Sequence, residues 1–77
     1  MQLSIVVNMY NTARYMPRCM DSLLHQDISA DSYEIILVND GSSDNSLEIA
    51  EDYVQVSKMN RAKGVLYPLI KVLTHEN

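Results

Sequence analysis

Glycine, cysteine and basic residues are scarce in this sequence of 77 residues. The two glycines, Gly41 and Gly64, stand far apart, which excludes the glycine-rich phosphate loops of dinucleotide-binding and P-loop proteins. The single cysteine, Cys19, excludes an internal disulfide and a thiol pair for zinc, and its place on an apolar helical face predicts a reduced, interior thiol. Six basic residues, spread singly in a chain of net charge −4, leave no stripe to neutralise a phosphate backbone. We therefore expect no nucleic-acid partner.

Long hydrophobic runs are also missing. The longest, Ile5–Val7 and Ile35–Val38, fall far short of the roughly 20 apolar residues that cross a membrane. The first residues lack the basic start and apolar stretch of a secretory signal. We expect no membrane segment in this chain and a cytoplasmic location, with attachment at the inner face of the membrane left open for a complete protein. An apolar fraction of 47% with 21% charged residues indicates a folded protein, and the length allows one small domain.

The hydrophobic pattern alternates between buried strands and amphipathic helices. Short apolar runs without alternation are typical of strands covered on both faces of a parallel sheet. The predicted elements are a strand Leu3–Val7, a helix Ala13–Gln26 with Pro17 in its first turn, a strand Tyr33–Val38, a helix from about Asn45 to Ser57, a loop Met59–Tyr67 and a strand Leu69–Leu73. Asp44 or Asn45 can cap the second helix, Asn45 together with Glu48 as a capping box. The order β-α-β-α-β predicts an α/β fold, one mononucleotide-binding half of a doubly wound, Rossmann-like sheet.

Polar residues follow the first two predicted strands. They are Asn8–Asn11 and Asn39–Asp44, and both segments would lie at the carboxyl rim of the sheet, where ligands of such folds bind. The start of the second helix adds backbone donors for an anion, so the rim predicts a nucleotide site. Two simpler interpretations stay open: Asp40 and its neighbours form only a turn and helix cap, and Tyr10 is a half-buried ring closing the sheet. His25 and His75 have no partner at metal-ligand spacing, so we expect no metal site.

Three blocks of this sequence resemble family 2 glycosyltransferases of the GT-A fold. They are Leu3–Val7 with Tyr10-Asn11, then Tyr15 and Cys19–Leu24 with Gln26, and then Glu34–Ser46, which contains Asn-Asp-Gly-Ser-Ser-Asp. His75-Glu76-Asn77 is similar to the exit of the family's third strand. Two features depart from the pattern: Asn8 stands where the family most often has proline, and Met59–Pro68 is longer and more apolar than the usual link. The resemblance implies a partial GT-A sheet, truncated, with residues 1–77 as its amino-terminal nucleotide-binding half.

The resemblance also implies a function. Such a domain binds a nucleoside diphosphate sugar, of the UDP or GDP type, and transfers the sugar to a glycan or lipid-linked acceptor. The implied nucleotide-sugar-binding residues are Tyr10 packing on the base, Asp40 accepting a hydrogen bond from a ring N–H, Asn11, which braces the first loop, and Gly41, which permits a positive-φ turn.

The parts that perform the chemistry are not expected in this chain. The family's Asp-x-Asp motif for Mg or Mn and its catalytic carboxylate belong to sequence after Asn77, and no Asp-x-Asp occurs here. We therefore expect no catalytic or metal-binding residues, and a chain that binds the donor without catalysing transfer. The alternative is a stand-alone nucleotide-binding or protein-interaction module whose sheet edges are covered by dimerisation.

Overall fold

The computed structural model describes residues 3–25, 29–41 and 43–75. They form five elements: β1 (Leu3–Met9), α1 (Met16–Leu24), β2 (Tyr33–Asp40), α2 (Ser46–Ala62) and β3 (Leu69–His75). The three strands are parallel and lie in the order β1-β2-β3. The predicted β-α-β-α-β arrangement is confirmed.

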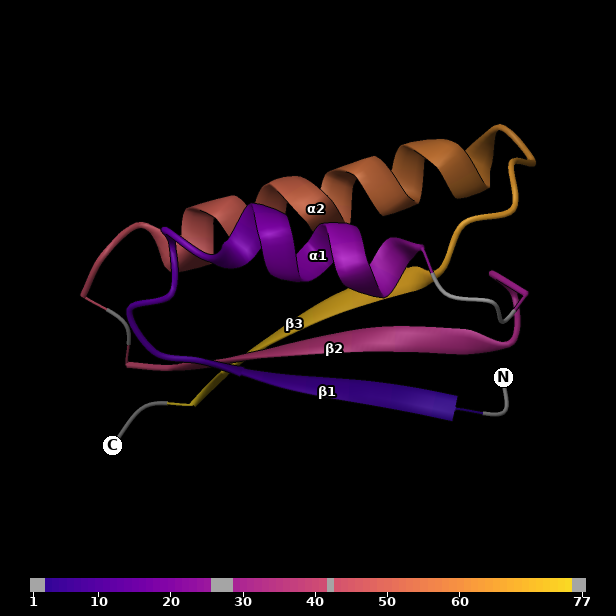
Figure 1. The fold of residues 1–77 in the computed structure, drawn as a ribbon. Helices are drawn as coiled ribbons and strands as arrows, with labels where there is room; N and C mark the ends of the chain where they lie inside the picture. Colours follow the sequence, from indigo (N-terminus) through magenta and orange to yellow (C-terminus); the bar gives the residue numbers. More distant parts are fainter. Residues whose placement is uncertain (1–2, 26–28, 42, 76–77) are drawn as a thin grey trace.

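Both helices pack on one face of the sheet (Figure 1). Right-handed crossovers that step in the same direction, from β1 to β2 to β3, must place their helices on the same side. Side chains of the central strand alternate accordingly, with Tyr33, Ile35, Leu37 and Asn39 buried and the residues between them only partly covered. The prediction of strands covered on both faces is therefore wrong for the described residues.

The core fills the layer between the helices and the sheet. Its buried hydrophobic residues are Met9, Met16, Met20, Tyr33, Ile35, Leu37, Ala50 and Ile70. Methionine contributes three of them, which suits a small, irregular space between two helices and a twisted sheet. Cys19 is a free thiol, as predicted, but it is only half-buried rather than interior.

Helix bounds differ from the predicted ones. Pro17 lies in the first turn of α1 as expected, but the helix begins at Met16, because Thr12 C=O accepts hydrogen bonds from the N–H groups of Tyr15 and Met16 in a preceding turn. The predicted end at Gln26 lies outside the described residues. The predicted loop from Met59 is wrong for its first four residues, since α2 continues to Ala62. Gly64, with φ +79°, ends it in the left-handed conformation that glycine adopts without strain.

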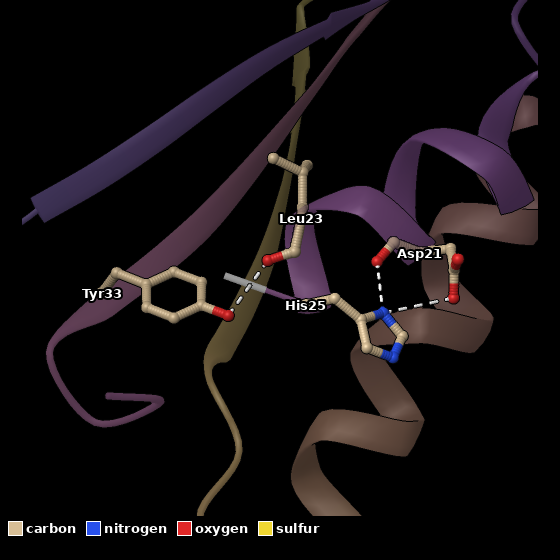
Figure 2. Close-up of polar contacts among 4 residues, drawn as sticks. All are labelled: Asp21, Leu23, His25 and Tyr33. Carbon is tan, nitrogen blue, oxygen red and sulfur yellow. Dashed lines mark hydrogen bonds and ion pairs between the residues drawn. The ribbon is translucent and has the colours of Figure 1, made fainter. Parts of the chain in front are cut away.

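Two polar contacts fasten the helices to the sheet, one of them part-buried and the other buried. The Tyr33 hydroxyl of β2 donates to the carbonyl of Leu23 near the end of α1, at 3.0 Å, and Figure 2 shows this contact beside the Asp21–His25 pair of the same helix. The Ser57 hydroxyl of α2 donates to Pro68 C=O at 2.7 Å and accepts from Ile70 N–H at 3.2 Å. Burial raises the pKa of Tyr33 above its usual range, so its hydroxyl remains a donor at neutral pH.

Candidate functional site

The carboxyl ends of β1 and β2 form the rim where the sequence placed a ligand. The last pair between the two strands is Met9 with Asn39, where paired backbones lie about 4.8 Å apart. Tyr10 directly follows Met9, and Asp40, the last residue of β2, directly follows Asn39. Tyr10 is 65% exposed, which excludes the interpretation of a half-buried ring that closes the sheet. Asp40 is exposed as well. An aromatic face and a carboxylate are thus offered together to solvent at one end of the sheet.

Gly41 gives the second loop its direction. Its φ is +71°, the left-handed region in which a side chain is strained, and the positive-φ turn predicted here is confirmed. A Cβ at this position would meet no heavy atom within 4 Å. The requirement for glycine is therefore conformational, because space is free around the position. The next residue, Ser42, lies outside the described residues.

Asn11 braces the second loop, across the rim from its own. Its backbone has φ +52°, a left-handed conformation that asparagine tolerates better than most residues. Its Oδ1 accepts hydrogen bonds from Ser43 N–H at 2.7 Å, from Ser43 Oγ at 3.1 Å and from Asp44 N–H at 3.3 Å. The side chain that was predicted to brace the first loop therefore joins that loop to the second one.

Asp44 makes the return connection. Its Oδ2 accepts from Ala13 N–H at 3.1 Å, and its Oδ1 accepts from both the N–H, at 3.0 Å, and the hydroxyl of Ser46. The buried Ser46 Oγ in turn accepts from Thr12 N–H at 2.9 Å. These contacts lower the pKa of Asp44, the hydrogen bond from the Ser46 hydroxyl most of all. We call the set formed by Asn11, Ser43, Asp44 and Ser46, with the amides of Thr12 and Ala13, the loop clip.

The loop clip changes two sequence-based interpretations. Asn45 is the N-cap residue of α2, yet its side chain makes no capping bond, so the predicted capping box is wrong and Asp44 is the residue that bonds the helix start. The sequence predicted that backbone N–H groups at the start of the second helix bind an anion of a ligand. One of them, the N–H of Ser46, donates to the carboxylate of Asp44 instead. Sequence reasoning missed Ser46 altogether, because a serine that follows Asp and Asn reads as ordinary helix-start composition.

The described part of the chain offers no metal centre. None of its His, Cys, Asp and Glu side chains gather in groups of three or more that could hold a metal ion. No described helix is long and apolar enough to cross a membrane.

A shallow hollow of about 310 Å³ lies on α2, lined by Ile49, Asp52, Tyr53 and Val56. It does not coincide with the rim, because none of its lining residues belongs to the strand-exit loops. This hollow is therefore separate from the candidate site at the strand exits.

Comparison with known proteins identifies the family. The sequence matches the family model described as glycosyl transferase family 2 over residues 4–77, and the chain belongs to this family. It is 55% identical to the glycosyltransferase EpsJ of Bacillus subtilis over 53 residues, which cover 69% of this chain and 15% of EpsJ. It is 43% identical to poly(ribitol-phosphate) beta-glucosyltransferase of Bacillus spizizenii over 53 residues, 69% of this chain and 8% of that protein.

Solved structures agree with the sequence relatives. The crystal structure of Staphylococcus aureus TarS 1-349 matches all of this chain with a TM-score of 0.75 and 31% identity, over 20% of its own length. A structure of the same protein in complex with UDP-GlcNAc gives the same TM-score over 19% of its length. The fold is accordingly part of a GT-A, Rossmann-like sheet, and the chain spans a fifth or less of these relatives.

Proposed function

We propose that this chain is the nucleotide-binding half, residues 1–77, of a glycosyltransferase domain, and that it binds the nucleoside diphosphate part of a sugar donor at the rim of β1 and β2. The observation that carries the proposal is that Tyr10 and Asp40, both exposed, directly follow the last residue pair of β1 and β2. The ring offers a stacking face to a base, and the carboxylate accepts a hydrogen bond from a ring N–H. Asn11 and Gly41 hold the two loops in the shape that presents them.

A uracil base fits this pair best. Its ring N–H lies on the edge opposite to the sugar, so a stacked uracil can donate to a carboxylate beside the stacking ring, whereas cytosine has no such donor. The similarity to TarS, whose structure contains UDP-GlcNAc, supports a UDP-type donor. Guanine also carries a ring N–H, which makes a GDP-type donor the second choice.

Sugar transfer requires more than this chain contains. Neutralising the diphosphate leaving group takes a divalent cation, Mg²⁺ or Mn²⁺, and deprotonating the acceptor hydroxyl takes a general base. The described residues do not fit a cation site, so we assign both functions to parts found in longer family members. In the complete enzyme the acceptor is a glycan or a lipid-linked glycan, and the enzyme acts in the cytoplasm or at the inner face of the membrane. The 77-residue chain alone binds the donor and does not transfer the sugar.

Calorimetric titration of the chain with UDP and with GDP tests the proposal. We expect UDP to bind, and Asp40→Ala to weaken binding by roughly ten-fold or more, since a lost hydrogen bond to a charged group is worth about 1.5–3 kcal/mol. Asp52→Ala, which removes an exposed carboxylate of α2 away from the rim, is the matched control and should bind like the parent chain. A folded chain that binds neither nucleotide, or one that Asp40→Ala does not affect, would exclude this site.

A further inference from the structure

Past the end of the β1–β2 pairing, side chains join the two loops of the candidate site. The pairing of β1 with β2 ends at Met9 and Asn39, before Tyr10, while Asp40 is the last residue of β2 and still pairs with His75 of β3. Beyond that point, five hydrogen bonds of the loop clip join the segment from Asn11 to Ala13 with the segment from Ser43 to Ser46. The relative position of the ring and the carboxylate therefore depends on the loop clip as well as on the sheet.

The loop clip is bonded in both directions. Asn11 reaches from the first loop to the amides of Ser43 and Asp44, and Asp44 with Ser46 reaches back to the amides of Ala13 and Thr12. Asn11 thus binds backbone of the second loop, and Asp44 and Ser46 bind backbone of the first loop. Such reciprocal networks stabilise more than the sum of their single contacts, because every bond holds the groups that make the next one.

We propose that Asn11 and Asp44 are positioning residues, which set the distance between Tyr10 and Asp40 and thereby the selectivity of the site for bases with a ring N–H. This inference rests on the proposed nucleotide-binding function. Asn11 acts through its hydrogen bonds to the second loop. Asp44 acts through its hydrogen bonds to the first loop and needs no contact with a ligand. If the loops separate, the ring can still stack on any base, but the carboxylate no longer meets the ring N–H of a stacked uracil.

The first test needs no ligand. In two-dimensional NMR spectra of the full chain, Asp44→Asn should shift the amide signals of Thr12 and Ala13, and Asn11→Gly should shift those of Ser43 and Asp44. Glycine suits position 11 because it keeps the positive φ while removing the acceptor. Asn45→Ala is the matched control, because Asn45 stands in the same loop and its side chain makes no capping bond. Unmoved first-loop amides in Asp44→Asn would overturn the loop clip itself.

The second test measures selectivity, as the ratio of the dissociation constants for CDP and UDP. We expect the parent chain to prefer UDP by roughly ten-fold or more, and both clip variants to lose most of that preference, since the preference arises from one charge-assisted hydrogen bond. A general loss of stability would weaken both nucleotides alike and leave the ratio unchanged. Shifted amides with an unchanged ratio would therefore overturn the positioning role while leaving nucleotide binding intact.

The outcomes separate the two proposals. If the parent chain binds neither UDP nor CDP, the proposed function fails, and the NMR comparison still decides whether the loop clip joins the loops. Should Asn11→Gly or Asp44→Asn unfold, Ser43→Ala serves instead, because it removes only the hydroxyl contact to Asn11 and keeps the amide contact. We expect Ser43→Ala to change the ratio of the CDP and UDP dissociation constants in the same direction but by less. The proposal is contradicted if Ser43→Ala binds nucleotide and shifts the Asn11 signals but leaves this ratio unchanged.

Discussion

Tyr10 contributes to the candidate site through its ring face. The side chain is 65% exposed, so a base can stack on it without displacing other residues. We predict that Tyr10→Ala weakens UDP binding by about 5- to 150-fold, the equivalent of the roughly 1–3 kcal/mol measured for base–aromatic stacking. Tyr10→Phe keeps the ring and should stay within about two-fold of the parent affinity. Calorimetry of the three chains decides, and an equal loss in the alanine and phenylalanine variants would transfer the role to the hydroxyl group.

Glu34 makes the stability of the chain depend on pH. The Ser4 hydroxyl donates to its Oε2 at 2.8 Å and Lys71 Nζ lies 3.2 Å from its Oε1, and these two contacts lower the pKa of Glu34. The hydrogen bond from Ser46 lowers the pKa of Asp44 in the same direction. As the pH falls, the carboxylates of the unfolded chain bind protons before those of the folded chain, whose pKa values are lowered. The stabilisation by Glu34 and Asp44 is therefore complete above the ordinary carboxyl pKa values near 4, and it is lost as the pH falls through the lowered pKa values of the folded chain.

Thermal unfolding between pH 3 and 7 measures this dependence. We expect the melting temperature to be level from about pH 5 upward and to fall below about pH 4, where the unfolded carboxylates begin to bind protons. Glu34→Gln should fall less steeply, and Glu51→Gln, an exposed carboxylate of α2, should follow the parent curve. Identical slopes in all three chains would show that the Ser4–Glu34–Lys71 contacts do not stabilise the fold.

The sequence predicted the individual site residues better than their connections. Tyr10, Asp40 and Gly41 could be located because a residue that follows a parallel strand must lie at the carboxyl rim, whatever the rest of the chain does. The bonds of Asn11 and Asp44 could not, since they join residues more than 30 positions apart and depend on how far each loop rises above the sheet. Assignment of these residues to ligand binding stays a prediction.

At the scale of elements, Ser57 fastens α2 to the start of β3. Its hydroxyl serves two backbone groups, Pro68 C=O and Ile70 N–H, in a buried position. We predict that Ser57→Ala lowers the free energy of unfolding by about 1–3 kcal/mol, because two buried polar groups lose their partner. For a domain this small, that is a large share of the total stability.

Urea unfolding followed by circular dichroism measures the effect. Ser29→Ala, which removes the same group from an exposed serine, should change the free energy of unfolding by less than about 0.5 kcal/mol. If Ser57→Ala is as stable as Ser29→Ala, the two backbone groups must find other partners. In that case the contact between α2 and β3 is held by apolar packing alone.

The order of the elements followed from the sequence, but several ends did not. Hydrophobic periodicity predicted all five elements, because each must bury one stripe or one face. Met59–Ala62 could not be assigned by that criterion, since this last turn of α2 lies beyond the apolar stripe and Met59 is 58% exposed. The helix ends just before Gly64, which has a positive φ, and the sequence pattern gave no sign that this glycine ends the helix.

At the scale of the whole molecule, the main consequence of the strand order is that no helix of the described chain covers the second face of the sheet. With the strand order β1-β2-β3, both helices lie on one face of the sheet. Some of the apolar residues from which the sequence predicted fully buried strands therefore lie on the opposite face. Val6, Ile36, Val38 and Leu73 share that face, with Val6 and Leu73 more than half exposed. An apolar strand sequence predicts that both faces of the strand are buried, but it does not show whether other elements are present to bury them.

This face should make the chain associate with itself. Exposed apolar patches on a sheet, next to unpaired strand edges, promote contact between copies. We predict that sedimentation velocity shows species larger than a monomer, increasing with concentration, and that Val6→Lys with Leu73→Lys shifts the distribution toward monomer. Met59→Lys, an equally exposed apolar residue on α2, is the control and should leave the distribution unchanged. If the control disperses the copies as well as the double variant does, association runs through the helices. If the parent chain is monomeric at all concentrations, the open face of the sheet is not adhesive.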